Sequence, residues 1–439
     1  MTAGEAADCE AESARSSAQT IQHRKVFVDS SWKITMPETM PAEPQGREYD
    51  LTMPAQVRCG AGRIAEVGSL AATRGSQVWL VTGGTSYAAC GADGPLQASL
   101  QEAGLGCQRV AQTAGEPTIA QVAVALAELP VAPAEVVVVA VGGGATIDFA
   151  KALAALVTNV EVRTPAEAEQ ALLDRLEGVG RGLPITRPPL PLVAVPTTAG
   201  TGAEATRNAV ISCPVRRFKK SLRSPLMVPQ AVVLDPDLVA SCSRATIAAA
   251  GLDCLTQLIE AFITRKRWSI PQALILEAFP QAVAAVPRLL ENQSDAQARV
   301  DLLHAAFISG VALGNSGLGL AHGVAAALGV ECSTPHGLAC ATLLPVALRV
   351  NRQAAQPELA RLDAALGDAP LPEAAAAERL IERVIAICLQ AGIPSRLSEL
   401  GLRRERLDWL AEHSGGNSMR GSPVQLSTAA LRDLLESVF

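Results

Sequence analysis

The feature that most constrains the fold is a β-branched, wholly apolar run that ends in three glycines. Residues 136–141 read Val-Val-Val-Val-Ala-Val, and Gly142, Gly143 and Gly144 follow directly. A strand without a polar face is typical of a parallel sheet covered by helices on both sides. Glycines between such a strand and a helix let backbone amides approach a phosphate, and the helix N terminus adds a favourable dipole. Tight strand–helix packing without a ligand explains the glycines equally well.

Strands alternate with helices on both sides of this run. Apolar strands are expected at residues 78–81 and within residues 189–198, and a helix is expected at residues 166–178. The alternation predicts an α/β domain with a parallel sheet, which we place at residues 48–241.

The remainder of the chain divides into a helical half and an N-terminal extension. After Asp235-Pro236-Asp237, apolar residues recur at helical spacing, which predicts an all-helical domain at residues 242–439. Residues 1–47 are polar and rich in Ala, Glu and Ser, which predicts a flexible extension. A chain of 439 residues also exceeds what one hydrophobic core usually supports.

The composition argues against several kinds of partner. A net charge of -6 and an aromatic content of 3% disfavour a nucleic-acid surface. The first residues lack the basic start and apolar core of a signal peptide, and the longest apolar runs are broken by Gly, Pro or charge before they could span a membrane. Ten cysteines without paired spacing predict free thiols in a reducing compartment. We therefore expect a cytoplasmic protein that binds neither nucleic acid nor membrane.

A second loop that carries candidate ligand-binding side chains follows the strand within residues 189–198. It reads Pro-Thr-Thr-Ala-Gly-Thr-Gly-Ala-Glu, and the hydroxyls of Thr197, Thr198 and Thr201 can hydrogen-bond a pyrophosphate, a ribose or a carboxamide. A polar surface turn would use the same residue types.

Acidic and imidazole side chains recur in the helical half. Asp253 and Gln257 are four residues apart, so they stand on one helical face. His322 and His336 each precede a glycine, and the chain has only five histidines, so the two are candidate metal ligands. A solvated helix face and packed, hydrogen-bonded histidines are the simpler interpretations of each pair alone.

These four segments, in this order, resemble the iron-containing (group III) alcohol dehydrogenases of the dehydroquinate synthase-like and glycerol dehydrogenase superfamily. The family motifs are a GGGSxxDxAK turn, a PTTxGTGSE loop, a GxDxxxHxxE helix and a GxxHxxxHxxG stretch followed by PHG. The resemblance runs from about residue 48 to the C terminus. It implies a dinucleotide-binding α/β domain, a helical domain and an active site in the cleft between them.

The resemblance also implies an activity and a set of site residues. The expected reaction is hydride transfer between NAD(P)(H) and an alcohol, aldehyde or ketone, assisted by a divalent metal, Fe or Zn. The metal ligands would be Asp253, Gln257, His322 and His336, of which Asp253, His322 and His336 would act in catalysis through the metal. The cofactor would contact Gly83, Gly142, Gly143, Gly144, Asp148, Thr197, Thr198 and Thr201. The expected partners are a small alcohol or carbonyl substrate and further copies of the chain, in a homodimer or higher homo-oligomer.

Three positions depart from the family pattern. Gln257 replaces a ligand histidine with a weakly binding amide, which leaves a three-ligand set with an open fourth position, as in catalytic zinc sites. Ala326 replaces a histidine expected near the nicotinamide and the substrate. Gly83 stands where NAD-selective relatives carry an aspartate, so NADP(H) is expected to be tolerated or preferred.

Other functions are compatible with the same residues. Gln257 favours a metal-independent reductase resembling the maleylacetate reductases, or a cofactor-binding relative without turnover. A dehydroquinate-synthase-like lyase is less favoured, because the helical half shows no cluster of basic residues suited to a phosphorylated sugar acid. Departures at pocket residues often accompany unusual substrates, so a role in a specialised biosynthetic pathway is a further hypothesis.

Overall fold

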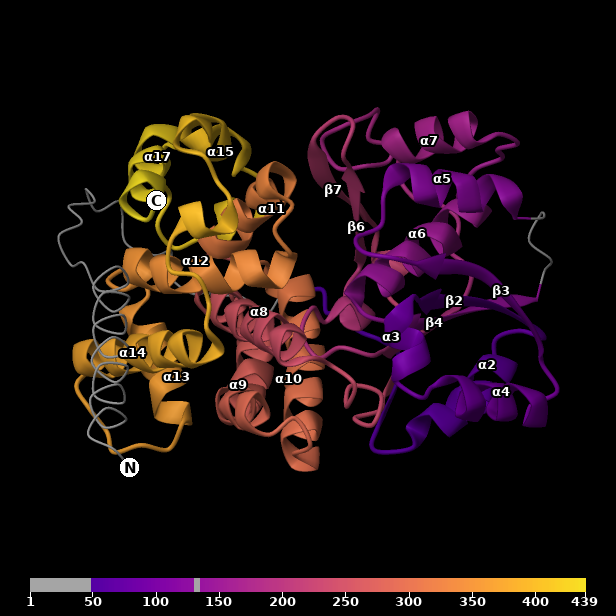
Figure 1. Cartoon of the computed structure of the whole chain (residues 1–439), viewed down its shortest axis with the longest axis horizontal. Helices are drawn as coiled ribbons and strands as arrows, with labels where there is room; N and C mark the ends of the chain where they lie inside the picture. The colour runs from indigo at the N-terminus through magenta and orange to yellow at the C-terminus, as the bar shows by residue number, and fades with distance from the viewer. Residues whose placement is uncertain (1–48, 130–134) are drawn as a thin grey trace, which may run out of the picture.

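The computed structural model describes residues 49–129 and 135–439. The expected extension at residues 1–47 lies outside the described residues. Figure 1 shows an α/β part and a helical part side by side, with the early chain in one and the late chain in the other. The predicted fold class, a parallel-sheet domain followed by an all-helical domain, is confirmed.

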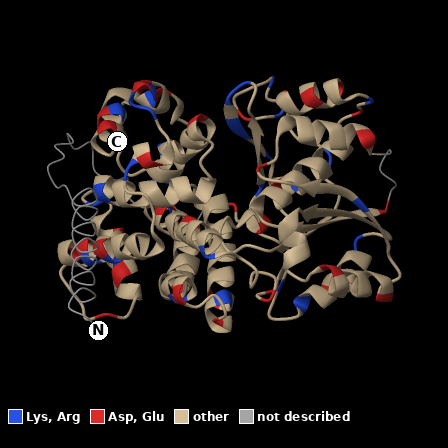
Figure 2. Ribbon diagram, viewed as in Figure 1, with Lys and Arg blue, Asp and Glu red and all other residues tan. Residues whose placement is uncertain are grey.

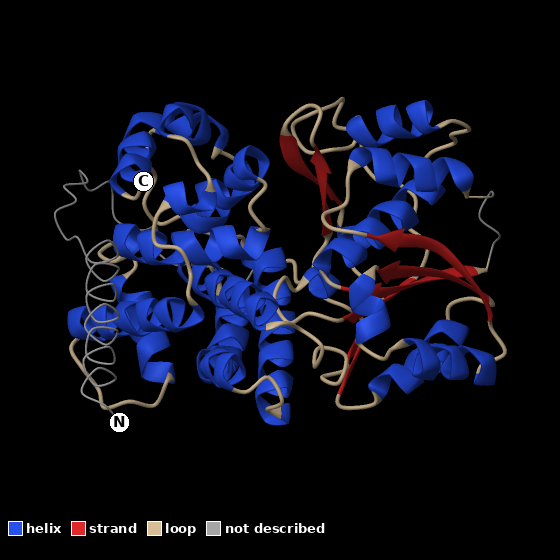
Figure 3. Cartoon of the chain, viewed as in Figure 1, coloured by secondary structure: helices blue, strands red, loops and turns tan. Residues whose placement is uncertain are grey.

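Six parallel strands form the main sheet. Their order is β1 (Gln56–Cys59), β8 (Ala231–Leu234), β5 (Leu192–Pro196), β4 (Val136–Gly142), β2 (Gln77–Gly83) and β3 (Gly106–Thr113). Helices cover both faces, as Figure 3 shows, namely α2 (Val67–Ala72), α3 (Thr85–Ala89), α4 (Asp93–Glu102), α5 (Ile119–Glu128), α6 (Gly144–Asn159) and α7 (Pro165–Leu173). In β4, Val137 and Val139 join the core with α2 and α4, whereas Val136 and Val138 join the core with α5, α6 and α7. Burial on both faces explains why this strand has no polar alternation.

A two-stranded antiparallel hairpin lies outside this sheet. It consists of β6 (Asn208–Cys213) and β7 (Phe218–Arg223) and follows the threonine-rich loop. The sequence pattern predicted only parallel strands here, so the hairpin was missed. Its alternating exposure in β6 has the two-residue period of a half-buried strand, which is the signal that could have found it.

Ten α-helices and two short 3-10 helices make up the helical part within the described residues. The α-helices are α8 (Arg244–Ile263), α9 (Ser269–Glu291), α10 (Ala296–Ser316), α11 (Leu320–Cys332), α12 (His336–Asn351), α13 (Gln356–Ala365), α14 (Glu373–Ala391), α15 (Leu407–His413), α16 (Asn417–Gly421) and α17 (Thr428–Ser437). Tyr49 stacks on Trp268 of this part, and Thr52 exchanges two backbone hydrogen bonds with the side chain of Asn315. The first described residues therefore contact the helical part, and the domain boundaries at residues 48 and 242 stay predictions.

Two helices, α8 and α9, are long and apolar enough to cross a membrane by length and composition alone. The bent pair α10 and α11 passes the same test together. The expectation that no segment would do so was wrong, because single Gly, Pro and charged residues interrupt the apolar runs without ending the helices. In α8, 83% of the most apolar window is buried inside the protein, as is typical of a helix surrounded by other helices.

Candidate functional site

The glycine turn and the threonine-rich loop are neighbours at the carboxyl edge of the sheet. β4 and β5 pair in register, and the Thr197 amide donates to the Gly142 carbonyl at 3.0 Å. A Cβ atom on Gly144 would collide with the Thr201 hydroxyl, and one on Gly143 would lie 3.3 Å from the Thr198 hydroxyl. Glycine is therefore required where the two loops meet, and α6 begins at this meeting point.

A buried lysine in the middle of α6 joins this helix to the hairpin and to the residues just before it. Lys151 Nζ donates to the Thr206 hydroxyl at 2.7 Å and to the Asn208 carbonyl at 3.0 Å. Asp148, one turn earlier, accepts from the Val210 amide at 2.9 Å. Burial lowers the pKa of Lys151 to about 8 and raises the pKa of Asp148 to about 6. Both residues hold the hairpin against α6, a role that the sequence reasoning did not assign to Lys151.

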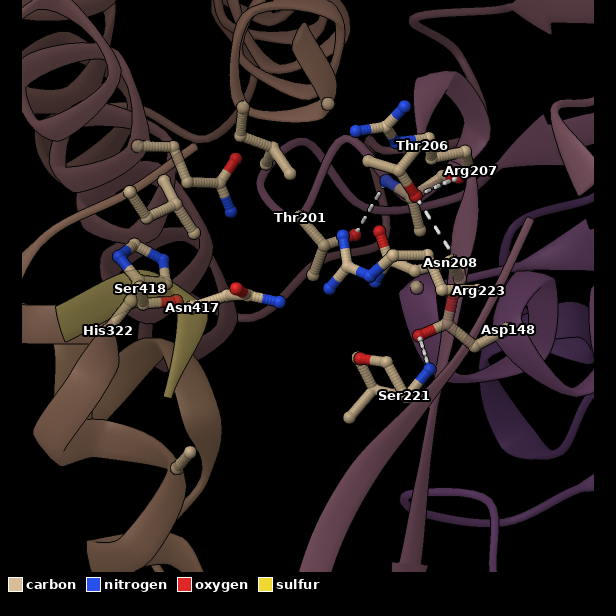
Figure 4. A pocket seen from close by; sticks show the side chains of 18 of the residues that line it. Asp148, Thr201, Thr206, Arg207, Asn208, Ser221, Arg223, His322, Asn417 and Ser418 are labelled. Carbon is tan, nitrogen blue, oxygen red and sulfur yellow. Dashed lines mark hydrogen bonds between the residues drawn. The ribbon is translucent and has the colours of Figure 1, made fainter. Parts of the chain in front are cut away.

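One cavity of about 470 Å³ joins the two parts of the molecule. Of the predicted cofactor residues, Gly144, Asp148 and Thr201 line it. The others lie behind them in the same loops or at the end of the adjacent strand β2: Gly83, Gly142, Gly143, Thr197 and Thr198. Gln257, His322, Ala326 and His336 line the helical side of the same cavity. In Figure 4, Asp148 and Arg207 lie on the α/β side and His322 on the opposite side.

Four potential metal-ligating side chains meet at the helical side. Asp253, His322, His336 and Cys340 each offer one ligand atom within 4.8 Å of the others. Asp253 Oδ1 lies 3.3 Å from His322 Nε2. Asp253 Oδ1, His322 Nε2 and His336 Nδ1 are buried and lack hydrogen-bond partners among the described residues. Buried polar atoms of this kind are costly unless something bonds them, so this donor set fits a divalent ion.

Glu260 orients His322 and was not assigned a role from the sequence. Its carboxylate accepts from His322 Nδ1 at 2.7 Å and from the amides of Gly319 and Ala321 at 3.0 and 2.7 Å. The carboxylate thus caps the N terminus of α11 and fixes the tautomer that turns Nε2 toward Asp253. Its position two helical turns after Asp253, in a strongly apolar helix, is the sequence signal that could have found it.

Gln257 is held by hydrogen bonds at both ends of its amide. Its Nε2 donates to Asp253 Oδ2 at 3.0 Å, and its Oε1 accepts from the Ser309 hydroxyl at 2.6 Å. A flipped amide would set two acceptor oxygens 3.0 Å apart, so the amide orientation follows from the network. Gln257 therefore points its nitrogen at the cluster and leaves Asp253 Oδ1 free to face His322.

The protonation of the cluster follows from burial and from its two carboxylates. Burial alone would raise the pKa of Asp253, but His322 and His336 hold it below its ordinary value. Burial opposes a charge on His322, yet Cys340 and the nearby carboxylates of Asp253 and Glu260 raise its pKa well above the ordinary value. Burial lowers the pKa of His336 to about 4, so this imidazole is neutral and able to coordinate.

A glycine turn at the edge of a parallel sheet, facing a buried carboxylate–imidazole cluster across one cavity, defines a dinucleotide-dependent oxidoreductase with a metal centre. Residues 54–236 match the model of the iron-containing alcohol dehydrogenases, and residues 247–439 match the model of the C-terminal part of the same family. The chain belongs to the iron-containing alcohol dehydrogenase family. Its activity is that of an oxidoreductase on alcohols and aldehydes.

Curated relatives and solved structures agree with this assignment. The chain is 31% identical to lactaldehyde reductase of Escherichia coli strain K12 over 381 residues, which cover 86% of this chain and 95% of that protein. It is 30% identical to the probable alcohol dehydrogenase EutG of Salmonella typhimurium over 389 residues, or 88% of this chain and 94% of the relative. The crystal structure of a 1,3-propanediol oxidoreductase superposes with a TM-score of 0.80 at 26% identity, covering 90% of this chain and all of the other.

Proposed function

We propose that this chain is a metal-assisted aldehyde reductase or alcohol dehydrogenase that tolerates or prefers NADP(H). The observation that carries the proposal is the single cavity with the glycine turn on one side and the Asp253–His322–His336 cluster on the other. Hydride transfer needs the nicotinamide ring and the carbonyl carbon to meet, and this cavity provides one place for both.

The α/β side of the cavity is the proposed cofactor site. The N terminus of α6 at Gly144 offers free amides to the pyrophosphate, with Gly142 and Gly143 keeping the turn close to the sheet. Asp148 belongs with these glycines on the phosphate side, and Thr197, Thr198 and Thr201 line the nicotinamide side in this proposal. Gly83 ends β2 without a carboxylate, so nothing at this position repels a 2′-phosphate.

The helical side is the proposed metal and substrate site. Asp253, His322 and His336 would hold a divalent ion, which when bound supplies a Lewis acid for the alcohol or carbonyl oxygen. Glu260 keeps His322 in its coordinating tautomer. Gln257 keeps Asp253 in place by donating a hydrogen bond to Asp253 Oδ2. The proposal also includes a cytoplasmic location, a homodimer or higher homo-oligomer, and a specialised biosynthetic role.

Elemental analysis of the purified protein, together with NADPH and NADH oxidation over a panel of aldehydes, tests this proposal. We expect bound Fe or Zn, activity that chelation abolishes and a higher kcat/KM with NADPH. Activity that persists after the metal is removed would favour the metal-independent reductase that resembles maleylacetate reductases. No change in NADPH absorbance with any aldehyde or alcohol would favour a cofactor-binding relative without turnover.

A further inference from the structure

The cluster of candidate metal ligands contains the thiol of Cys340, whereas the family resemblance implied the amide of Gln257 as the fourth ligand. Cys340 is fully buried and stands one turn after His336 on α12, so both side chains face α8. Its sulfur lies 3.7 Å from His336 Nε2 and within 4.8 Å of the ligand atoms of Asp253 and His322. The sulfur is thus inside the cluster.

Gln257 is badly placed to be the fourth ligand. Its only metal-binding atom, Oε1, is engaged by the Ser309 hydroxyl, and its nitrogen is directed at Asp253. An amide N–H group has no lone pair to offer a cation. Coordination by Gln257 would require breaking both hydrogen bonds in a region where Gln257 is 3% exposed.

We propose that Cys340, and not Gln257, is the fourth protein ligand, so that the site is an Asp-His-His-Cys site selective for a borderline-soft divalent ion such as zinc, where the substrate oxygen would enter as a fifth ligand. The inference rests on the proposed metal-assisted function. Binding forms a sulfur–metal bond, and the thiol releases its proton to solvent. One thiolate beside two imidazoles and a carboxylate favours Zn²⁺ over the harder ions that prefer oxygen.

Cobalt substitution tests the ligand directly, because a thiolate bound to Co²⁺ produces a charge-transfer absorption in the near ultraviolet that oxygen and nitrogen ligands do not. The metal-free full-length protein is titrated with Co²⁺ alone. We expect this band in the wild type, its loss in Cys340→Ser and its retention in Gln257→Leu. The control is Cys388→Ser, which removes another fully buried thiol from a position outside the cluster.

Each outcome decides the assignment. Wild-type protein that binds cobalt without the band, or that binds no cobalt, overturns it without recourse to a variant. A band that persists in Cys340→Ser also overturns it. If the band is absent while chelation still abolishes aldehyde reduction, the proposed function stands and only the assignment of Cys340 fails.

A second inference rests on the charges that line the cavity. Four cationic side chains line it against two carboxylates, namely Arg207, Lys219, Arg223 and Lys266 against Glu116 and Asp148. Lys219 pairs with Glu116, and Arg223 lies 3.5 Å from Glu177. The hairpin carries much of this charge, which is drawn in blue in Figure 2.

Two of these cations lack a carboxylate partner within the described residues. Lys266 and Arg207 appear in none of the ion pairs, and Arg207 Nε is buried without a hydrogen-bond partner. They come from opposite sides of the cavity, since Arg207 precedes β6 and Lys266 follows α8. Figure 4 shows Arg207 and Arg223 beside Asn208 on the α/β side, facing Asn417 and Ser418. A guanidinium in a cavity favours a ligand with a carboxylate, phosphonate or sulfonate group.

From these unpaired charges we infer that the substrate is a small aldehyde or alcohol that bears such an anionic group. This deepens the proposed function and depends on it. The probes are butanal and 4-oxobutanoate, which share a four-carbon chain and differ by one carboxylate, together with a sulfonate and a phosphonate of the two-carbon aldehyde. We expect kcat/KM to be at least about tenfold higher for the anionic aldehydes, a difference of about 1.4 kcal/mol.

Variants separate substrate binding from cofactor binding. Arg207→Leu and Lys266→Ala are expected to remove the preference by raising KM for the anionic aldehyde more than KM for butanal. The control is Arg216→Leu, an exposed arginine of the hairpin that does not line the cavity. Equal kcat/KM for both four-carbon aldehydes in the wild type overturns the inference while leaving the reductase assignment intact. A weaker NADPH affinity with an unchanged anion preference in Arg207→Leu assigns the charge to the cofactor and overturns it as well.

Discussion

Replacing Glu260 by glutamine tests whether this carboxylate orients the metal site. An amide has one oxygen where the carboxylate has two. The less costly orientation keeps an oxygen at the position that serves Gly319 and His322 and sets the amide nitrogen against the backbone amide of Ala321, now 2.7 Å from Glu260 Oε1. Ala321 then loses its acceptor in a buried region.

The expected cost follows from these contacts. A buried donor left without a partner costs roughly 1–3 kcal/mol. Losing the negative charge at the N terminus of α11 costs about 1 kcal/mol more. We therefore expect Glu260→Gln to lower the free energy of unfolding of the metal-free protein by about 3 kcal/mol. Because His322 loses its charged partner, we expect metal affinity to fall roughly 10–100-fold.

Two measurements check this prediction. Urea unfolding followed by circular dichroism reports stability, and chelator competition with Zn²⁺ reports affinity. Glu102→Gln, an exposed glutamate on α4, is the matched control. Unchanged zinc affinity in Glu260→Gln, even with a loss of stability, would refute the orienting role and reduce Glu260 to a helix cap.

Three further substitutions test a buried carboxylate, the cofactor preference and a close helix–loop contact. Burial raises the pKa of Glu204 from 4.5 to about 7, so its contribution to stability is full below about pH 4.5 and is lost as pH rises through 7. Urea unfolding should therefore show Glu204→Gln to be about 3 kcal/mol more stable than the wild type above pH 7, with no gain at low pH; an equal difference at both pH values would contradict this. Gly83→Asp should reverse the preference toward NADH by placing a carboxylate against the 2′-phosphate, and an unchanged ratio of kcat/KM for NADPH and NADH would show that selectivity lies elsewhere. A Cβ atom on Gly310 would collide with the Gly202 carbonyl, so calorimetry should show Gly310→Ala destabilised by about 1–3 kcal/mol; the control Gly314→Ala meets nothing closer than 3.9 Å, and equal stability of the two variants would be the contrary result.

The sequence predicted the elements whose signals are local. Residues 136–141 are apolar on both faces, and the glycines after them mark the turn into α6, so the parallel sheet and the turn could be predicted directly. The helical half was predicted equally well from the helical spacing of its apolar residues. The hairpin was missed because the charged residues of β7 obscure any apolar alternation there, and because the sequence argument considered only parallel strands in this region.

The cluster was only partly predictable, because its contacts join residues far apart in the chain. Asp253, His322 and His336 were found through the family resemblance. Ser309, 52 residues away in the sequence, hydrogen-bonds the Gln257 amide oxygen, and no local sequence pattern predicts that contact. Cys340 carries a weak local signal, since it lies one turn from His336, but ten scattered cysteines gave no reason to choose it. The side chains of the cluster and their hydrogen-bond partners come from α8, α10, α11 and α12, so no single sequence segment contains the site.

The contacts of Gln257 also explain how a site that has lost a histidine can keep its shape. A buried amide is costly unless both ends are bonded, and here Ser309 satisfies the oxygen while Asp253 accepts from the nitrogen. The same donation leaves Asp253 with one free oxygen directed at His322, which is the arrangement a metal ligand requires. Gln257 therefore stabilises the geometry of the other ligands, and a sulfur already within the cluster can complete the coordination. In the proposed Asp-His-His-Cys site, the departure from the family pattern therefore changes which ion the site favours more than whether it can hold one.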